Sequence, residues 1–371
     1  MKAAAIIFAN LQNEMLDELT RKRTTASLPF GGRYRLIDFA LSNIVSADIV
    51  DVGVIAQKNY QSLMDHVGSG KDWDLSRRNG GLSIFPPFSN YKSDFLSTNR
   101  LEALKTIMGF ISKVKDDTIV LMDCDSVNVI NFDDILKQHA ENKADITVLY
   151  QTCVVPSILK DHMSFELNEK NKVVKATLDS PVGVQANVSI NVWIMNRRFL
   201  QSAVSEAISL GQNSFERDII LNNIKSVRVF GYEYKGIYMP ITSIEDYYKN
   251  NMRLLDPSIR EQIFEQDNHR IYTKVRDSAP TRYGSTANVV NSFIADGCEI
   301  EGTVINSILF RGVKVGKGTV VENSILMQDT IVGNNVHLNC VITDKNVAIR
   351  DRNSLSGCEK IPYYLSKNAM V

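Results

Sequence analysis

The sequence predicts an α/β domain followed by a parallel β-helix. From residue 1 to about residue 255, short apolar runs alternate with longer amphipathic segments. This alternation is typical of a mostly parallel sheet with helices on both faces. From residue 281 to residue 371, β-branched residues recur six positions apart, which is typical of a parallel β-helix. The polar segment 256–280 joins the two regions, so we expect a connector between two domains.

The apolar runs of the first region are predicted to be buried strands. They are apolar at successive positions, as expected for a parallel sheet that is covered on both sides. The predicted strands are 3–9, 52–56, 118–122 and 146–150, and the predicted helices are 34–45, 60–67, 100–111 and 132–141. Ligands of such sheets bind beyond the carboxyl ends of the strands. The segment after residue 9 and the acidic stretch 123–125 lie at such ends, so we expect a site there.

The second region is predicted to form a triangular coil with one short strand on each side. Apolar residues lie six positions apart, and Gly or Asn stands between them at the expected corners. The spaced pairs are Ile294 and Ile300, Val315 and Val321, Ile325 and Ile331, and Val341 and Val347. An ordinary β-sandwich is the alternative, but sandwich strands usually recur at about eight to twelve residues. We expect the coil to serve packing and assembly, with 358–371 capping it or packing on the first domain.

Composition excludes several classes of function. Lys+Arg and Asp+Glu both number 42, so the formal net charge is zero, which argues against a general nucleic-acid binder or a protein of anionic membranes. No apolar run approaches the roughly 20 residues of a membrane span, and the first residues lack the layout of a secretory signal. The five cysteines contain no CxxC and the five histidines no HExxH. We therefore expect a reduced, cytoplasmic protein without structural zinc.

One segment carries a family resemblance. Residues 28–43 read LPFGGRYRLIDFALSN and follow the run 3–9 and Arg23. This order resembles the start of the ADP-glucose pyrophosphorylases, which are glucose-1-phosphate adenylyltransferases. Other motifs of that family follow in order: Ala56-Gln57 with Ser62-Leu63, Gly68 to Leu75, Gly80-Gly81 with Pro86-Pro87, Phe215 to Asp218, Asn251 to Leu255, Ile300 to Gly302, Asn306-Ser307 and Arg311 to Gly316.

The resemblance covers nearly the whole chain and implies both a fold and a reaction. The implied fold is a Rossmann-like, GT-A-like nucleotidyltransferase domain with a mixed, mainly parallel sheet, followed by a left-handed parallel β-helix of hexapeptide repeats. We place the domain at 1–255, the connector at 256–280 and the β-helix at 281–371. The implied reaction joins ATP and glucose 1-phosphate to give ADP-glucose and pyrophosphate.

The phosphate loop of the family is degraded in this sequence. Its glycines fall on Asn10, Leu11 and Asn13, its arginine on Met15, and a lysine on Thr25. A triphosphate loop needs glycines because its backbone must approach the phosphates closely. No glycine occurs before position 31, so a shifted alignment cannot restore the loop.

Only one of the two metal-binding aspartates of the family is present in this sequence. Nucleotidyl transfer uses a divalent cation held by carboxylates. One family aspartate falls on Asp125, but the other falls on Pro240, whose side chain has no ligand atom. We therefore expect no well-formed metal site and no cofactor requirement for this chain, with Mg²⁺ serving an active partner. A capping or turn role is the alternative for Asp125.

The resemblance also implies binding residues. For the nucleotide these are Gln57, which would read the adenine, with Arg23, Gly80 and Gly81. For the sugar phosphate they are Asp179, Ser189 and Trp193, although the family lysine next to Asp179 is replaced by a serine. In the nucleotide region, Asn99 and Arg100 are expected to crowd the space.

An effector site is implied at Arg33 and Arg35. A lysine at the Arg33 position contributes to binding an anionic effector in the family, and arginine suits bidentate phosphate contact. The alternative is that these arginines pair with acidic neighbours such as Asp38.

Three functions follow from the resemblance. The first is a non-catalytic regulatory subunit in a heterotetramer with a catalytic, GlgC-type ADP-glucose pyrophosphorylase subunit. The second is a slow, Mg²⁺-dependent enzyme that relies on Asp125. The third is a sensor that binds a nucleotide or sugar-phosphate effector without chemistry, and this role is compatible with the first.

Overall fold

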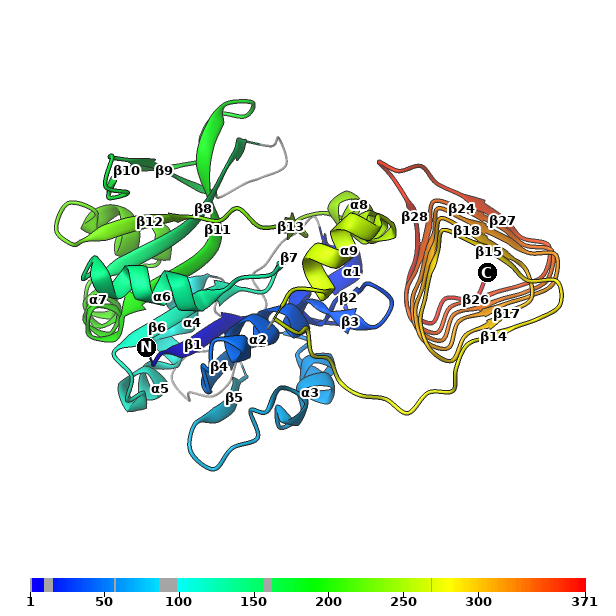
Figure 1. Ribbon diagram of the computed structural model, residues 1–371, viewed down its shortest axis with the longest axis horizontal. Coiled ribbons are helices and arrows are strands. Elements are labelled where there is room, and N and C mark those ends of the chain that lie inside the picture. Colours follow the sequence, from blue (N-terminus) through cyan, green and yellow to red (C-terminus); the bar gives the residue numbers. More distant parts are fainter. Residues whose placement is uncertain (1, 10–15, 57, 87–98, 156–161, 268) are drawn as a thin grey trace. The chain divides into compact units, whose positions relative to one another are not determined.

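Figure 1 shows the computed structural model of the chain, which describes residues 2–9, 16–56, 58–86, 99–155, 162–267 and 269–371. The chain forms two compact units, each built from several segments. Unit 1 comprises Met1–Gln12, Thr24–Ala26 and Phe39–Tyr238. Unit 2 comprises Asn13–Arg23, Ser27–Asp38 and Met239–Val371.

Unit 1 contains a nine-stranded mixed sheet. Its main path has the order β10-β9-β11-β6-β1-β4-β5, and β8 pairs with β11 and β12. The strands are β1 (Ala4–Phe8), β4 (Asp51–Ile55), β5 (Gly81–Phe85), β6 (Thr118–Asp123), β8 (Ile146–Val154), β9 (Met163–Leu167), β10 (Val173–Leu178), β11 (Gln185–Asn196) and β12 (Val229–Glu233). The neighbours β6, β1, β4 and β5 are parallel, whereas β11 is antiparallel to β6, β8 and β9.

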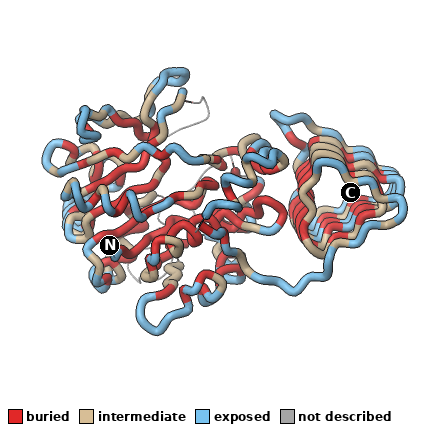
Figure 2. Tube along the Cα trace, in the orientation of Figure 1, coloured by how far each residue is buried: buried red, intermediate tan, exposed pale blue. Residues whose placement is uncertain are grey.

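The middle of this sheet is buried because its sequences are apolar at successive positions. All five residues of β1 and all six of β6 are buried, and Figure 2 shows these strands as continuous buried segments. The four strands predicted from apolar runs correspond to β1, β4, β6 and the first half of β8. The carboxyl ends of β6, β1 and β4 therefore lie along one edge of the parallel part of the sheet.

Helices connect these strands, and asparagines cap three of them. The side chains of Asn99, Asn131 and Asn196 accept hydrogen bonds from backbone N–H groups in the first turns of α4, α6 and α7. The helices are α2 (Leu36–Ser46), α3 (Gln61–Val67), α4 (Arg100–Thr106), α5 (Met108–Lys113), α6 (Phe132–Glu141) and α7 (Arg197–Ser209), with the shorter turns η3 (Lys71–Trp73), η4 (Phe215–Ile220) and η5 (Leu221–Asn223). The single helix predicted over 100–111 is divided at Ile107, whose backbone leaves the helical region.

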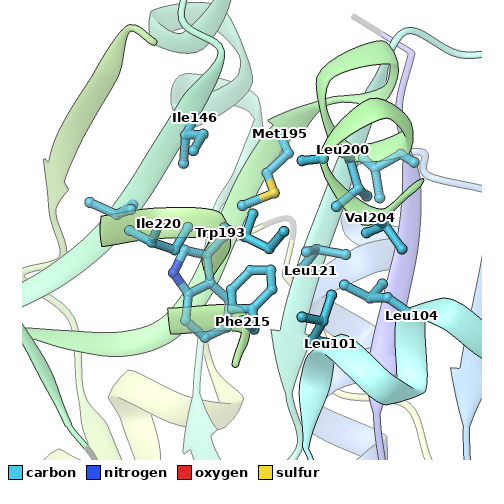
Figure 3. Packing of buried hydrophobic residues seen from close by; sticks show 14 of the residues in the cluster. Leu101, Leu104, Leu121, Ile146, Trp193, Met195, Leu200, Val204, Phe215 and Ile220 are labelled. Atoms are coloured by element: carbon cyan, nitrogen blue, oxygen red, sulfur yellow. The ribbon is translucent and has the colours of Figure 1, made fainter. Parts of the chain in front are cut away.

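The core of unit 1 lies between β11, β6 and the helices that follow. Trp193 and Phe215 are fully buried, and their ring centroids are 5.2 Å apart in an edge-to-face arrangement. Figure 3 shows these two rings packed together, with Leu101 and Leu104 of α4 and Leu200 of α7 nearby. Burial of such large rings contributes strongly to stability.

Unit 2 is built around a parallel β-helix, which Figure 1 shows as a triangle of stacked coils. Each side is a five-stranded parallel sheet. The first sheet is β14 (Arg282–Tyr283), β17 (Glu299–Ile300), β20 (Lys314–Val315), β23 (Ile331–Val332) and β26 (Ala348–Ile349). The second is β15 (Asn288–Val290), β18 (Thr303–Ile305), β21 (Val320–Glu322), β24 (His337–Asn339) and β27 (Ser354–Ser356). The third is β16 (Phe293–Ile294), β19 (Ile308–Leu309), β22 (Ile325–Leu326), β25 (Val341–Thr343) and β28 (Tyr363–Leu365). The predicted architecture, an α/β domain with a mixed, mainly parallel sheet followed by a parallel β-helix, is confirmed.

Serine side chains satisfy backbone groups inside one corner of this coil. The backbone N–H of Ser307 donates to Ser292 Oγ (3.2 Å), that of Ser324 to Ser307 Oγ (3.1 Å), and that of Val341 to Ser324 Oγ (3.1 Å). Each hydroxyl therefore accepts a hydrogen bond from the next coil. This ladder removes the cost of buried, unpaired N–H groups at a bend between strands.

Left-handed residues make the turn at the same corner. Asn291, Asn306, Asn323 and Cys340 have φ values of 43°, 46°, 46° and 52°. Asparagine tolerates this conformation better than other non-glycine residues. The amide of Asn291 also donates to Asn306 Oδ1 (2.8 Å), which links the side chains of two coils.

N-terminal segments belong to unit 2 because they pack on the β-helix. The guanidinium of Arg23 donates to both carboxylate oxygens of Asp344 (2.6 and 2.8 Å), and both side chains are buried. The hydroxyl of Tyr364 donates to the same carboxylate (3.0 Å). The segments carry α1 (Asp17–Thr20), β2 (Pro29–Phe30) and β3 (Tyr34–Arg35), whereas the short turn η2 (Thr25–Ser27) passes from unit 1 into unit 2. Unit 2 also holds α8 (Ile244–Met252), η6 (Arg253–Leu255) and α9 (Pro257–Phe264). The compact units therefore divide the chain differently from the predicted boundaries at 255 and 281, and α9 lies within the predicted connector.

Two short strands complete the description. β7 (Ser126–Asn128) follows β6, and β13 (Tyr238–Pro240) spans the point where the chain passes from unit 1 to unit 2. None of the described helices is both long and apolar enough to cross a membrane.

Candidate functional site

The candidate site of unit 1 lies at the carboxyl end of β6. Asp123 is the last residue of this strand, and its side chain is 1% exposed. Arg100, the first residue of α4, donates from Nε to Asp123 Oδ1 (3.0 Å) and from Nη2 to Asp123 Oδ2. Its Nη1 donates to Glu216 Oε1, which comes from η4. One guanidinium thus joins two carboxylates from separate elements, and we refer to Arg100, Asp123 and Glu216 as the arginine clamp.

An aromatic ring supports the guanidinium of the clamp. The Cζ atom of Arg100 lies 4.9 Å from the ring centroid of Trp193. The negative face of an aromatic ring attracts a cation at this distance. Trp193 is itself fixed by its contact with Phe215, so Arg100 is held by both carboxylates and a rigid ring.

Burial and charge oppose one another in the clamp. Burial raises the pKa of Asp123 to about 7, against the lowering effect of Arg100. Burial lowers the pKa of Arg100, but Asp123 and Glu216 raise it by more, so the guanidinium keeps its charge. A buried carboxylate needs such a partner, because an unpaired charge is costly away from water.

Asp125 lies in the turn between β6 and β7, close to the clamp. Its Oδ1 atom is buried and has no hydrogen-bond partner among the described residues. Burial raises the pKa of Asp125, and the charge of Arg100 acts in the opposite direction. Burial also raises the pKa of Tyr238 well above its ordinary value, and Asp125 and Asp123 add to this effect. Asp125 is therefore in the electrostatic field of the clamp without a direct contact to its guanidinium.

The residues at this edge do not fit the divalent cation that nucleotidyl transfer would need. Both oxygens of Asp123 are bound by Arg100. Pro240, at the second predicted metal position, ends β13 in unit 2 and offers no side-chain ligand. In the part of the chain that the structure describes, no group of three or more His, Cys, Asp or Glu side chains is arranged to hold a metal ion.

A second candidate site is a cluster of cations in unit 2. Burial lowers the pKa of Lys345 to about 7, and Arg35, Arg23 and Arg276 lower it further. Burial likewise lowers the pKa of Arg311, with added effects of Arg33 and Arg276. These residues therefore influence one another electrostatically. We refer to Arg33, Arg35, Arg276, Arg311 and Lys345 as the cationic cluster.

The two predicted effector residues differ in their surroundings within this cluster. Arg33 is exposed, and its Cζ atom lies 5.8 Å from the ring centroid of Tyr34. Arg35 is 8% exposed, and its backbone N–H donates to Asp38 Oδ2 (3.0 Å). This contact comes from the backbone of Arg35, so a pairing of the arginine side chains with Asp38 stays a prediction. Two further carboxylates near the cluster are already engaged, since Asp344 is bound by Arg23 and Asp296 lies 3.6 Å from Arg311 Nε.

Two family models match the chain. The model for nucleotidyl transferase matches residues 4–157, and the model for the GlmU-like C-terminal hexapeptide matches residues 277–358. The glycogen biosynthesis protein GlgD of Bacillus subtilis (strain 168) is 34% identical over 95% of this chain and 92% of its own length. The glucose-1-phosphate adenylyltransferase of Clostridium botulinum (strain Alaska E43 / Type E3) is 33% identical over 86% of this chain and 83% of its own.

The chain belongs to the glucose-1-phosphate adenylyltransferase family. The resemblance seen in the sequence motifs is thereby confirmed. A second GlgD, from Geobacillus stearothermophilus, is 34% identical over 86% of this chain and 83% of its own length. The family positions predicted from sequence can now be placed in the structure one by one.

The nucleotide positions of the glucose-1-phosphate adenylyltransferase family are found in different surroundings. Gln57 lies outside the described residues, as do Asn10, Leu11, Asn13 and Met15 of the degraded loop. Arg23 is bound to Asp344 and 3% exposed, which argues against a direct contact with a nucleotide.

The paired glycines have a backbone reason of their own. Gly80 and Gly81 have φ values of 75° and 92°, and a Cβ atom on Gly81 would lie 2.6 Å from the carbonyl oxygen of Leu75. Only glycine fits this turn into β5 without strain. A nucleotide contact at either glycine stays a prediction.

The sugar-phosphate positions of the family do not converge on one surface. Trp193 is 1% exposed and belongs to the core, which argues against a direct contact of its ring with a sugar phosphate. Ser189 is buried in β11, and its Oγ accepts the backbone N–H of Asn191 (3.1 Å) at an irregularity of the strand. Asp179 is exposed in the turn after β10, with its side chain 3.8 Å from His162.

A cavity of about 570 Å³ lies among β8, β9, β10 and β11, next to the Asp179 turn. Its lining includes Ser180 and Pro181 but none of the three predicted sugar-phosphate residues. The lining also contains the ion pair of Lys175 with Glu166 (2.7 Å). A lysine that is already paired is a weak binding group for phosphate.

Sequence reasoning missed the partners in both candidate sites. The crowding expected from Asn99 and Arg100 stays a prediction, and Asp123 and Glu216 were not predicted as partners of Arg100. Arg276, Arg311 and Lys345 of the cationic cluster were also missed. Arg311 stands in a segment whose sequence was read only as β-helix, and nothing in the local pattern indicates that it lies near Arg33.

Proposed function

We propose that this chain is a regulatory, catalytically impaired subunit of glucose-1-phosphate adenylyltransferase in glycogen biosynthesis. The observation that carries the proposal is the end of β6, where Arg100 binds both carboxylate oxygens of Asp123. The family motifs also align their second metal-binding aspartate with Pro240, whose side chain has no ligand atom. The loss of one such electrostatic contact typically costs about 10²–10³ in rate. The relatives named GlgD and glucose-1-phosphate adenylyltransferase support the assignment to glycogen synthesis.

The proposal includes a partner. A catalytic, GlgC-type subunit would convert ATP and glucose 1-phosphate to ADP-glucose and pyrophosphate with its own Mg²⁺, in a heterotetramer with this chain. The role of this chain would be to change the turnover or the effector response of that subunit. The preserved scaffold supports this division, because both family models still match while the site chemistry has changed.

The test compares three samples in a pyrophosphorylase assay: this chain alone, the catalytic subunit of the same organism alone, and their mixture. We expect the chain alone to show less than about 1% of the catalytic subunit's rate. The mixture should differ from the catalytic subunit in kcat, KM or effector response, and native mass spectrometry should detect a mixed tetramer.

The opposite result would make the chain an enzyme in its own right. Substantial activity of the chain alone, lost in Asp125→Ala, would contradict the proposal. The matched control is Asp145→Ala, which removes an aspartate that pairs with Arg228 on the surface. This control should leave any such activity unchanged.

The cationic cluster favours a second, compatible role as the receptor of an anionic effector. Lys345 has a pKa lowered to about 7, so it gains charge as the pH falls through this value. A phosphate bound beside it would therefore bind more tightly at pH 6.5 than at pH 8.

Thermal shift with fructose 1,6-bisphosphate, hexose monophosphates and ATP tests this role, because a ligand of the native state raises the unfolding midpoint. We expect a saturable shift that is larger at pH 6.5 and is reduced in Arg33→Gln. Arg228→Gln, which lies outside the cluster, is the control. A shift that is unchanged by Arg33→Gln, or no shift with any of these anions, would contradict the assignment.

A further inference from the structure

The chain itself supplies a cation to the carboxylates at the end of β6, because the guanidinium of Arg100 lies among them. Asp123 comes from β6, Asp125 from the following turn and Glu216 from η4, so three segments bring negative charge to one place. Arg100 contacts two of these carboxylates, and its charge acts on the third. The guanidinium thus balances negative charge that would otherwise need another cation.

The placement of Arg100 is not explained by its own helix. It is the first residue of α4, at the helix end where a positive charge is unfavourable. Asn99 already caps this end by accepting the N–H of Glu102 (3.0 Å). The guanidinium must therefore owe its position to the carboxylates and to the ring of Trp193, which lie outside α4.

The clamp also fixes the geometry of the site. Both Asp123 oxygens point at the guanidinium in a bidentate pair, the strongest geometry for an arginine and a carboxylate. A metal ion could bind these oxygens only after Arg100 had left them. The displaced guanidinium would then be a largely buried charge without its bidentate partner, which is costly.

We propose that the guanidinium of Arg100 is a built-in substitute for the divalent cation, which balances the carboxylates at the end of β6 and keeps metal out. The inference deepens the proposed function, on which it rests, by naming the residue that occupies the carboxylates next to Asp125, the predicted metal position. It makes the site an ion-paired structural joint between β6, α4 and η4. It also implies that removal of Arg100 alone would uncover an acidic site able to take a hard cation.

A luminescent cation can report on this site because Trp193 lies against it. Tb³⁺ prefers oxygen ligands, and it emits when a nearby tryptophan is excited. The chain has only two tryptophans, Trp73 and Trp193. The experiment titrates Tb³⁺ into the native full-length chain and into Arg100→Gln, with Mn²⁺ as a competitor.

The expected results differ sharply between the two proteins. The native chain should show no saturable Tb³⁺ emission that depends on Trp193. Arg100→Gln should bind Tb³⁺ at least about tenfold more tightly, and Mn²⁺ should displace it. Its unfolding midpoint should fall relative to the native chain and then rise when Mn²⁺ is added, as expected for a cation bound to the native state.

Three control variants separate the opened site from the general effects of losing an arginine. Arg228→Gln also removes an arginine from a bidentate pair with an aspartate, but on the surface, and should behave like the native chain. Arg100→Gln with Trp193→Phe should lose the emission while Mn²⁺ still raises the unfolding midpoint. Arg100→Lys keeps a positive charge and should not gain the site.

Each remaining outcome decides the question. Saturable, Trp193-dependent binding to the native chain would overturn the inference, as would a folded Arg100→Gln protein that binds neither cation. If Arg100→Gln does not fold without metal, Mn²⁺ should restore its folding, and a failure to restore it counts against the inference. The pyrophosphorylase mixture uses the native chain, so its result tests the regulatory role separately.

Discussion

At the scale of single residues, His139 makes the stability of the chain depend on pH. It lies in α6, is 3% exposed, and places Nδ1 2.7 Å from Thr147 Oγ1. Burial lowers its pKa to about 4, although Asp145 acts in the opposite direction. An unfolded histidine has a pKa of about 6.5, so the unfolded chain binds this proton more readily than the folded chain does.

The first prediction follows from the sign of this difference. The contribution of neutral His139 to stability is complete above about pH 6.5 and is lost as the pH falls toward about 4, with a total of about 3 kcal/mol. Urea unfolding at pH 7 and pH 4.5 should show a smaller loss in His139→Gln than in the native chain. Equal losses in both proteins would contradict the assignment to His139.

At the scale of secondary-structure elements, a buried ion pair fastens the N-terminal segment of unit 2 to the β-helix. Arg23 and Asp344 are 3% and 4% exposed at their side chains, and 321 positions separate them in the sequence. The carboxylate also receives the Tyr364 hydroxyl and the backbone N–H of Lys345 (2.6 Å). Its oxygens are therefore fully used.

The second prediction concerns the removal of one charge from this pair. Asp344→Asn leaves the guanidinium of Arg23 buried without a counterion, which should cost about 3–5 kcal/mol of unfolding free energy. The double variant Arg23→Met with Asp344→Asn should recover part of this loss, because the buried charge is gone. Denaturant unfolding of the single and double variants provides the measurement. Additive losses would show that the two side chains do not act as a pair.

The sequence predicts local elements better than distant partners. The apolar run 3–9 and the six-residue spacing after residue 281 are local patterns, and they correspond to β1 and to the β-helix strands. No proline in the sequence predicts the break of the helix at Ile107. The break depends on how α4 and α5 pack in the core. The pairs of Arg100 with Glu216 and of Arg23 with Asp344 join residues 116 and 321 positions apart. No local pattern carries that information.

From the sequence, the candidate site could be predicted only through the family residues that are missing from it. Pro240 and the missing glycines can be read against the family motifs, and Asp125 can be placed at the end of the predicted strand 118–122. From the sequence, Arg100 could be recognised only as a large residue in the nucleotide region of the family. Its function depends on Asp123 and Glu216, which only the folded chain brings together.

At the scale of the whole molecule, the β-helix of unit 2 is covered on one outer face. Ile308 and Ile325 alternate with the interior residues Leu309 and Leu326, yet all four are fully buried. Within unit 2, Arg23 Nη1 lies 3.8 Å from the sulfur of Met327 on this sheet. A Cβ atom on Gly32 would lie 3.5 Å from Phe293, so the segment 27–38 also approaches this sheet.

The third prediction is that the β-helix is not a stable fragment by itself. A fragment 281–371 lacks the segments 16–23 and 27–38 and should expose the outer face of its third sheet. We expect it to bind the dye ANS and to elute as aggregates, whereas the full chain should do neither. A monodisperse fragment without dye binding would show that the N-terminal segments do not protect this face.

The long sequence separation of Arg23 and Asp344 also means that the two residues are synthesised at very different times. A ribosome adds about 5–20 residues per second, so the 321 positions between the two residues take roughly 15–60 s to translate. During this interval the segment that carries Arg23 has left the ribosome while its partner has not been made. The Arg23 side chain therefore cannot pair with Asp344 until the last coils of the β-helix have been made. A pause before residue 344 would prolong the time during which Arg23 lacks its counterion.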